Sequence, residues 1–171
     1  MNELVAAPDM QEIFNDTGVI ASAREFREYA EALGNAMEAD VETNTLAKSV
    51  CTYIHSFHNG IYTRHMKIPK GIFIVGYIHR QDHTSIISRG KILSRCENGG
   101  VVALDASEHP LIFMSPKGTR RMVLAVEDTY WTTIHATSAT TVEAAEAELF
   151  NTYYEDFLVE FPELGLEEIA A

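Results

Sequence analysis

The sequence predicts a mainly β domain with helical extensions at both ends. Apolar residues recur at helical spacing before residue 50, seven or eight short strand-like segments separated by turn signals fill residues 51–137, and an acidic helical pattern follows. Closely spaced strands without intervening helices are typical of a β-sandwich or barrel, not of βαβ units. We therefore expect a helical N-terminal extension (1–50), a β domain (51–137) and an acidic helical C-terminal extension (138–171).

The best helical segment of the first extension is SAREFREYAEALG. Ser22 and Glu25 match a capping box, which would satisfy free amide donors at the helix start. One face of this helix would carry the apolar side chains of Phe26, Tyr29, Ala30 and Leu33. Gly34 is expected to end the helix in a left-handed conformation, and a second, weaker helix is expected over NAMEADVETNTLAKSV.

The β domain is predicted from short segments bounded by glycine and proline. Gly90 is expected to split one segment by a turn, and the NGG at 98–100 is a hairpin signal. The segments are GIYTRHMKIP, KGIFIVGYIH, TSIISRGKILSRC, VVALDA, PLIFMSP, RRMVLAVED and TYWTTIHAT.

The second extension is predicted to form one acidic helix. Thr140 and Glu143 match another capping box, and the helix is expected to run to about residue 158 before breaking near Pro162. Its apolar face would carry Val142, Ala145, Leu149 and Tyr153. Such a helix docks on its own domain or on a partner subunit.

Charge and composition narrow the function classes. The net charge of −12 argues against nonspecific nucleic-acid binding, which needs many cations. No apolar run is long enough to span a membrane, and the first residues lack the features of a secretory signal, so we expect a cytoplasmic protein. Two cysteines are expected to be reduced thiols. Residues 51–137 hold ten bases and six acids, which would suit an anionic small molecule, whereas charged flanks can also serve solubility alone.

The stretch GYIHRQDHTSIISRG, together with SPKGTRR, resembles the two motifs of the cupin superfamily, whose members are small jelly-roll barrels that often carry a metal. Gly76, His79, His83 and Gly90 fit the first motif, and Pro116 and Gly118 fit the second. This chain departs from the family at three ligand positions. Tyr77 stands at the first histidine position, His83 near the usual glutamate, and Arg121 at the last histidine position.

A longer strip, from HNGIYTRHMKIPKG to EDTYWTTIHAT, is also similar to small cupin-like proteins encoded by bacteriophages. This resemblance implies a jelly-roll fold and a phage source more than it implies an activity. It also implies pairing of the barrels into homodimers, for which bare sheet edges are a physical reason.

The sequence is compatible with two kinds of site in the barrel interior, a metal site and an anion pocket. His79, His83 and His135 would converge if the barrel closes as in cupins, and three neutral imidazoles suit zinc, iron, nickel or manganese. Alternatively, each histidine satisfies a hydrogen bond of its own. An arginine cannot ligate a metal, so Arg121 instead indicates an anion pocket, unless it pairs with Glu127, Asp128 or Asp105. The candidate ligand-binding residues are Tyr77, Arg121, Trp131 and Arg64.

Three functions follow as hypotheses. The first is a small-molecule-binding protein that holds an anionic or nucleotide-like ligand, acting in the host cytoplasm, with counter-defence as one role. The second is a structural or assembly protein that contacts other virion proteins. The third is a metal-dependent enzyme of unassigned reaction. Fold alone does not choose among them.

Overall fold

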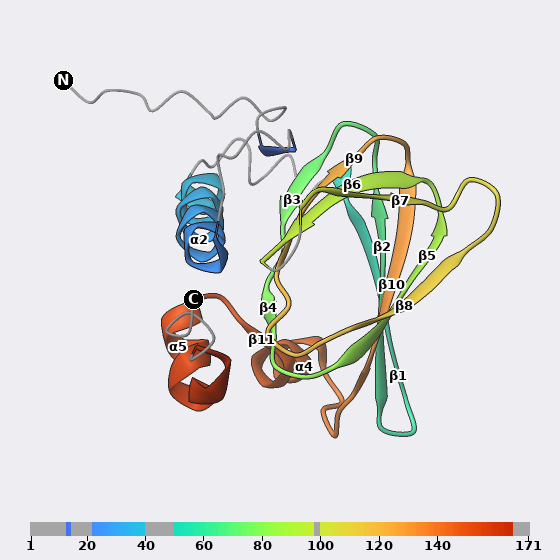
Figure 1. The fold of residues 1–171 in the computed structure, drawn as a ribbon. Helices are drawn as coiled ribbons and strands as arrows, with labels where there is room; N and C mark the ends of the chain where they lie inside the picture. The colour runs from blue at the N-terminus through green and yellow to red at the C-terminus, as the bar shows by residue number, and fades with distance from the viewer. Residues whose placement is uncertain (1–12, 15–21, 40–49, 98–99, 166–171) are drawn as a thin grey trace.

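A computed structural model of the chain describes residues 13–14, 22–39, 50–97 and 100–165 (Figure 1). Helix α2 (Ala23–Ala39) precedes the strands. The strands are β1 (Thr52–His58), β2 (Ile61–Ile68), β3 (Phe73–Val75), β4 (Ile78–His79), β5 (His83–Arg89), β6 (Lys91–Cys96), β7 (Val102–Asp105), β8 (Leu111–Ser115), β9 (Arg121–Ala125) and β10 (Thr129–Ala136). The chain continues through α4 (Val142–Leu149), β11 (Phe150–Asn151), α5 (Tyr154–Glu160) and a 3₁₀ turn, η1 (Pro162–Leu164).

Two antiparallel sheets face one another (Figure 1). The larger sheet has the order β1-β2-β10-β5-β8 and the smaller one β3-β9-β6-β7. The chain passes repeatedly from one sheet to the other between β2 and β10. As a result, β10 lies between β2 and β5, and β9 lies between β3 and β6. Eight strands in two four-stranded sheets with this order form a jelly roll, extended here by β1. The fold is therefore mainly β and cupin-like, as the sequence predicted.

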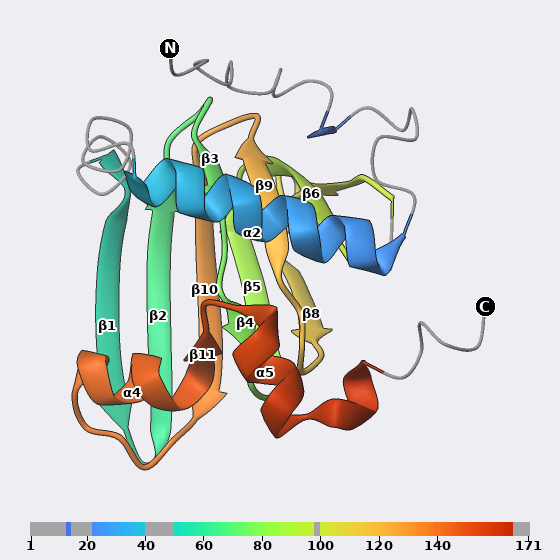
Figure 2. The ribbon, with the colours of Figure 1, turned by 90° about the vertical axis from the view of Figure 1, so that its left-hand side faces the viewer.

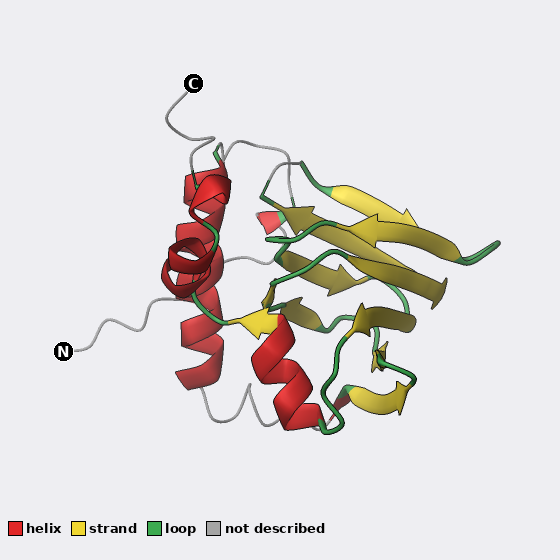
Figure 3. Cartoon of the chain, turned by 90° about the horizontal axis from the view of Figure 1, so that it is seen from below, coloured by secondary structure: helices red, strands yellow, loops and turns green. Residues whose placement is uncertain are grey.

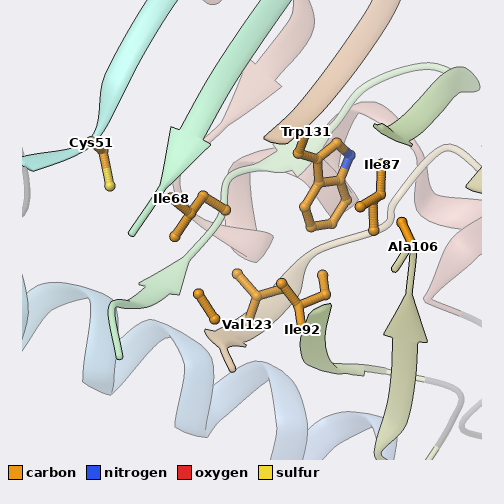
Figure 4. Packing of buried hydrophobic residues seen from close by; sticks show 8 residues of the cluster. Cys51, Ile68, Ile87, Ile92, Ala106, Val123 and Trp131 are labelled. Carbon is orange, nitrogen blue, oxygen red and sulfur yellow. The ribbon is translucent and has the colours of Figure 1, made fainter. Parts of the chain in front are cut away.

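The core between the sheets follows from strict alternation along the strands. On β5 the buried side chains are His83, Ser85 and Ile87, and on β10 Trp131 and His135 are buried. Figure 4 shows the apolar half of this core, where Trp131 and Ile87 of the larger sheet meet Ile92 and Val123 of the smaller sheet. Side chains alternate between the two faces of a strand, so the alternation that buries these apolar residues also points His83 and His135 into the interior.

Helix α2 covers the outer side of the smaller sheet (Figure 2). The predicted capping box is confirmed, since Ser22 Oγ accepts from the Glu25 amide and Glu25 accepts from the Ser22 amide. Phe26 and Ala30 are fully buried, and Tyr29 and Leu33 pack against the same cluster. The prediction that Gly34 ends the helix is wrong because the helix continues to Ala39. Residues 40–49, most of the second predicted helix, lie outside the described residues.

The C-terminal extension is not the single helix that the sequence predicted. Helix α4 ends at Leu149, and the next two residues form β11, which pairs with β4 before α5 begins (Figure 3). The N-cap is Thr141, one residue later than predicted, and its hydroxyl accepts from the Ala144 amide. Ala145 and Leu149 are buried as expected, but Tyr153 lies beyond the helix and is 43% exposed. Pairing with β4 outweighs the continuous helical pattern.

Strand β1 is not among the strands that the sequence predicted. β1 and β2 form a hairpin through Asn59 and Gly60, both at positive φ, so the Asn-Gly signal was present in the sequence. His58 is exposed, but half-buried His55 bonds to the hydroxyl of the buried Tyr62 at 2.7 Å. Residues 98 and 99 of the NGG signal lie outside the described residues, and the proposed domain boundaries stay a prediction. None of the described helices is long and apolar enough to cross a membrane.

Candidate functional site

Three histidines from three strands meet inside the jelly roll. His83 starts β5, His135 is near the end of the neighbouring strand β10, and His79 ends β4. One ring nitrogen from each lies within 4.8 Å of the others. The ring centroids are 3.9 Å apart for His79 and His83, and 4.6 Å apart for His83 and His135. The predicted convergence of the three side chains is confirmed.

Among the described residues, these histidines make fewer hydrogen bonds than buried imidazoles usually do. Both ring nitrogens of His135 and the Nδ1 atoms of His79 and His83 are buried without a partner. Burial lowers the pKa of His83 to about 4 and that of His135 to about 3. Burial, followed by the neighbouring His83 and His135, holds the pKa of His79 well below its usual range. All three rings are therefore neutral at pH 7. The alternative that each satisfies its own hydrogen bond is not supported for His135.

A cavity of about 250 Å³ lies beside His79 and His83. All four predicted ligand-binding residues line it, together with Tyr53, Thr133 and Phe150. Thr133 lies between Arg64 and Ser85 in the strand register, and its hydroxyl is buried without a partner. Trp131 lines the cavity and also belongs to the apolar core. The sequence predicted the inward face of β10 that provides Trp131 and Thr133.

Arg121 enters the cavity from β9. Its guanidinium donates to Ser115 Oγ at 3.2 Å and lies 5.5 Å from the centre of the Phe113 ring. Burial lowers the pKa of Arg121, and within the described part of the chain no carboxylate oxygen lies within 4.0 Å of it. The alternative pairing with Asp105 or Asp128 is wrong because these two pair with Lys91 and Lys67.

Arg64 enters the cavity from β2, while its neighbour His65 lies on the opposite face and bonds to Thr132, as the alternation requires. The Arg64 guanidinium lies 4.8 Å from the centre of the Tyr53 ring and 5.7 Å from that of Phe150. Its ion pair with Glu146 is long, at 4.0 Å, and its Nε has no partner. Arg64 is thus held by two aromatic rings more than by its carboxylate.

Phe150 is a site residue that the sequence interpretation missed. Its ring packs edge-on against His79 and His135, with centroids 4.9 and 5.6 Å apart, and stacks on Tyr77 at 5.7 Å. No sequence signal identified it because it falls inside the predicted acidic helix. The pairing of β11 with β4, which sets Phe150 opposite His79, places the C-terminal extension against the histidines.

Comparisons with known proteins found no matching family model and no matching curated protein. Among solved structures, the chain is similar to cupin superfamily proteins. One, from Desulfitobacterium hafniense, has 11% identity and a TM-score of 0.43 over 52% of this chain and 78% of that chain. KdgF from Halomonas sp. has 14% identity and a TM-score of 0.43 over 52% and 80%. An RmlC-like cupin from Methanocaldococcus jannaschii has 12% identity and a TM-score of 0.41 over 50% and 81%.

Because these TM-scores are below 0.5, the fold assignment rests on the strand order of this chain and not on the comparisons. The comparisons do not support the resemblance to phage proteins.

Proposed function

We propose that this protein binds an anionic small molecule in the cavity, next to a divalent metal ion held by His79, His83 and His135. The observation that carries the metal is the pair of unpartnered ring nitrogens on buried His135. Leaving a buried polar atom unpaired costs about 1–3 kcal/mol, and a neutral imidazole nitrogen is a good metal ligand. A metal ion shared by the three rings would give one of these two nitrogens a partner.

The donor set fits this role. Three neutral imidazoles suit zinc, iron, nickel or manganese, and the lowered pKa values keep the rings in the form that ligates a metal at pH 7. Three protein ligands leave a coordination position free. His79 and His83 line the cavity, so a ligand in the cavity would lie beside that position.

The anion is inferred from charge balance. A divalent ion at the histidines would add two positive charges beside Arg64 and Arg121, which already lower the pKa of His79. Repulsion among cations in a partly buried site is costly unless negative charge is present. An acidic ligand would supply that charge, and Tyr77 and Trp131 would offer aromatic surface to a base or sugar ring. Metal and anion are therefore expected to strengthen each other's binding.

A second candidate function, a metal-dependent enzyme, is favoured by the free coordination position next to the cavity. A metal ion bound there would polarise a carbonyl or activate a water molecule. The phage source, the counter-defence role, the virion role and the cytoplasmic location have no support in the structure and stay predictions from the resemblance and the sequence.

Metal analysis by mass spectrometry tests the proposal first. We expect one metal ion per chain in freshly purified wild type and none in His135→Ala. The control is His58→Ala, which removes an exposed histidine outside the site and should retain the metal. A wild type that takes up no zinc, iron, nickel or manganese after reloading would contradict the metal centre.

The anion is tested in the same experiment by measuring zinc affinity with and without carboxylate and phosphate anions. At least one anion should raise the affinity by about 10-fold or more, which is a coupling of about 1.4 kcal/mol. Arg121→Gln should abolish this gain, whereas Arg89→Gln, a change at an exposed arginine, should not. If the anion raised the zinc affinity of Arg121→Gln as much as that of wild type, the anion would be binding to the metal without Arg121, which would contradict the proposed pocket.

A further inference from the structure

The inward side chains of the larger sheet lie in rows that change from polar to apolar along the strands. Strand register places inward residues of β10 and β2 side by side: His135 with Tyr62, Thr133 with Arg64, and Trp131 with Met66. Successive rows lie two residues apart, and a strand rises about 3.4 Å per residue, so the His135 row and the Trp131 row are about 14 Å apart. The cavity follows this direction, since the Thr133 and Trp131 rows line it and His79 and His83 lie at its other end.

The end of the cavity near the histidines is polar. Arg64 and Thr133 line it there, and the Thr133 hydroxyl has no partner among the described residues. Arg121 reaches the same end from the smaller sheet, because its guanidinium donates to Ser115, which pairs with His83 in the strand register. A negatively charged group would find hydrogen-bond donors at this end.

The other end of the cavity is apolar. Met66 and Trp131 line it from the larger sheet, and the register neighbours Ile74 and Val123 line it from the smaller sheet. All four belong to one apolar cluster or pack against it. The indole nitrogen of Trp131 lies on the side of Ile87, which is outside the cavity lining (Figure 4). A hydroxyl or a charge placed between these four side chains would lose its hydration without gaining a hydrogen bond.

The volume of the cavity limits the size of a ligand. An engineered cavity of about 150 Å³ in another protein holds benzene, with its six carbon atoms, so a cavity of about 250 Å³ has room for about ten non-hydrogen atoms. A nucleoside monophosphate has about twice as many. A carboxylate takes about three of the ten atoms and a phosphate about five, so a carboxylate leaves more of the cavity to an apolar group.

We propose that the ligand is a carboxylic acid with an apolar tail, of about ten non-hydrogen atoms in all. This inference rests on the proposed anion site and narrows its ligand to a monoanion. The carboxylate would lie between Arg121 and Thr133, beside the histidines, and the tail would lie between Trp131 and Val123. Desolvation without compensation excludes a sugar, a base or a second charge in place of the tail.

Calorimetric titration of wild type with linear carboxylates tests this proposal, with zinc present at one ion per chain. From acetate to octanoate the affinity should rise by about 4-fold for each added methylene group, as expected for its burial. Octanedioate has the length of octanoate but carries a charge at the far end, and should bind at least about 10-fold more weakly. Adenosine monophosphate should also bind more weakly than octanoate. These comparisons use wild type alone, so they do not depend on the folding of a variant.

Met66→Gln locates the tail. This variant should bind acetate as wild type does and should lose most of the gain per methylene group, because an amide replaces an apolar wall of the cavity. Met114→Gln is the matched control, since Met114 is 63% exposed and lies outside the cavity lining, and its whole series should match that of wild type.

The outcomes separate the tail from the anion site. Equal affinities for acetate and octanoate, or octanedioate or adenosine monophosphate binding as tightly as octanoate, would overturn the proposed tail and leave the anion site standing. A wild-type series in Met66→Gln would likewise overturn it, because the tail would lie elsewhere. If none of these anions bound, both the tail and the anion site would be wrong.

Discussion

At the scale of single residues, His135 distinguishes this interior from an ordinary polar core. It is 1% exposed, and its ring lies against four others, those of Tyr62, His79, His83 and Phe150. A structural histidine at such a position normally donates one ring nitrogen and accepts at the other. Here neither nitrogen has a partner within the described part of the chain, which is the observation behind the proposed metal ligand.

The lowered pKa values of these histidines predict a loss of stability in acid. Above pH 6.5 the rings are neutral in both folded and unfolded chains. Below it the unfolded chain takes up protons, while folded His83 and His135 resist protonation down to about pH 4 and 3. We expect the free energy of unfolding of metal-free protein, measured in urea, to fall by about 1–2 kcal/mol more between pH 7 and 5 in wild type than in His135→Gln.

The control for this prediction is His58→Gln, whose exposed histidine should leave the wild-type pH dependence intact. Parallel curves for wild type and His135→Gln would contradict the burial of a neutral ring at this position.

At the scale of elements, Gly90 carries the chain from β5 in the larger sheet to β6 in the smaller sheet. Its φ is +100°, and a Cβ there would lie 2.4 Å from the Asp128 carbonyl oxygen and 2.6 Å from Thr129 Oγ1. The crossing therefore needs glycine for two separate reasons, backbone conformation and space.

Gly90→Ala should accordingly destabilise the protein by about 3 kcal/mol or more, as strain from positive φ adds to a steric clash. Gly71→Ala is the matched control, because Gly71 has φ +81° but a methyl group added there would meet no atom within 4 Å. It should cost only about 1 kcal/mol. Urea unfolding measures the free energy of unfolding of both variants. An equal decrease in the two variants would contradict the steric contribution of Asp128 and Thr129 at Gly90.

At the scale of the whole molecule, opposite charges help to hold the C-terminal extension against the jelly roll. The acidic C-terminal extension meets basic residues of the jelly roll in three ion pairs, Arg64–Glu146, Arg80–Glu160 and Lys117–Glu163. Buried Arg120 joins the parts more firmly, since it donates to the Gly76 carbonyl at 2.8 Å and to the Thr152 carbonyl at 3.1 Å. The extension thereby holds Phe150 against the histidines.

Replacing Arg120 with Met should therefore loosen the C-terminal extension and lower the free energy of unfolding by about 2–3 kcal/mol, because two partly buried carbonyls lose a charged donor. Limited proteolysis should also cut the extension faster in this variant. Arg24→Met is the control, since Arg24 and its partner Glu28 are largely exposed and such pairs contribute about 0–1 kcal/mol. Unchanged proteolysis in Arg120→Met would contradict this docking role.

Local patterns predicted much of the fold. Short segments bounded by glycine and proline predicted seven strand-like stretches, and alternation grouped the residues that share a face on β5 and on β10. The capping box located the start of α2. Local patterns failed where tertiary contacts outweigh local preference. Gly34 remains helical because α2 packs on the smaller sheet, and the acidic helix is interrupted because β11 pairs with β4.

The candidate site divides in the same way. Spacing by itself determined which side chains share a strand face, such as His83 with Ser85 and Trp131 with His135, because a strand alternates whatever it packs against. The resemblance to cupins then supplied the expectation that His79, His83, His135 and Arg121 lie in the interior. Only the tertiary structure decided that, among the described residues, both ring nitrogens of His135 lack a partner and Arg121 lacks a carboxylate, and that Phe150 packs against the histidines. These properties depend on which distant strands become neighbours, and a local pattern contains no information about that pairing.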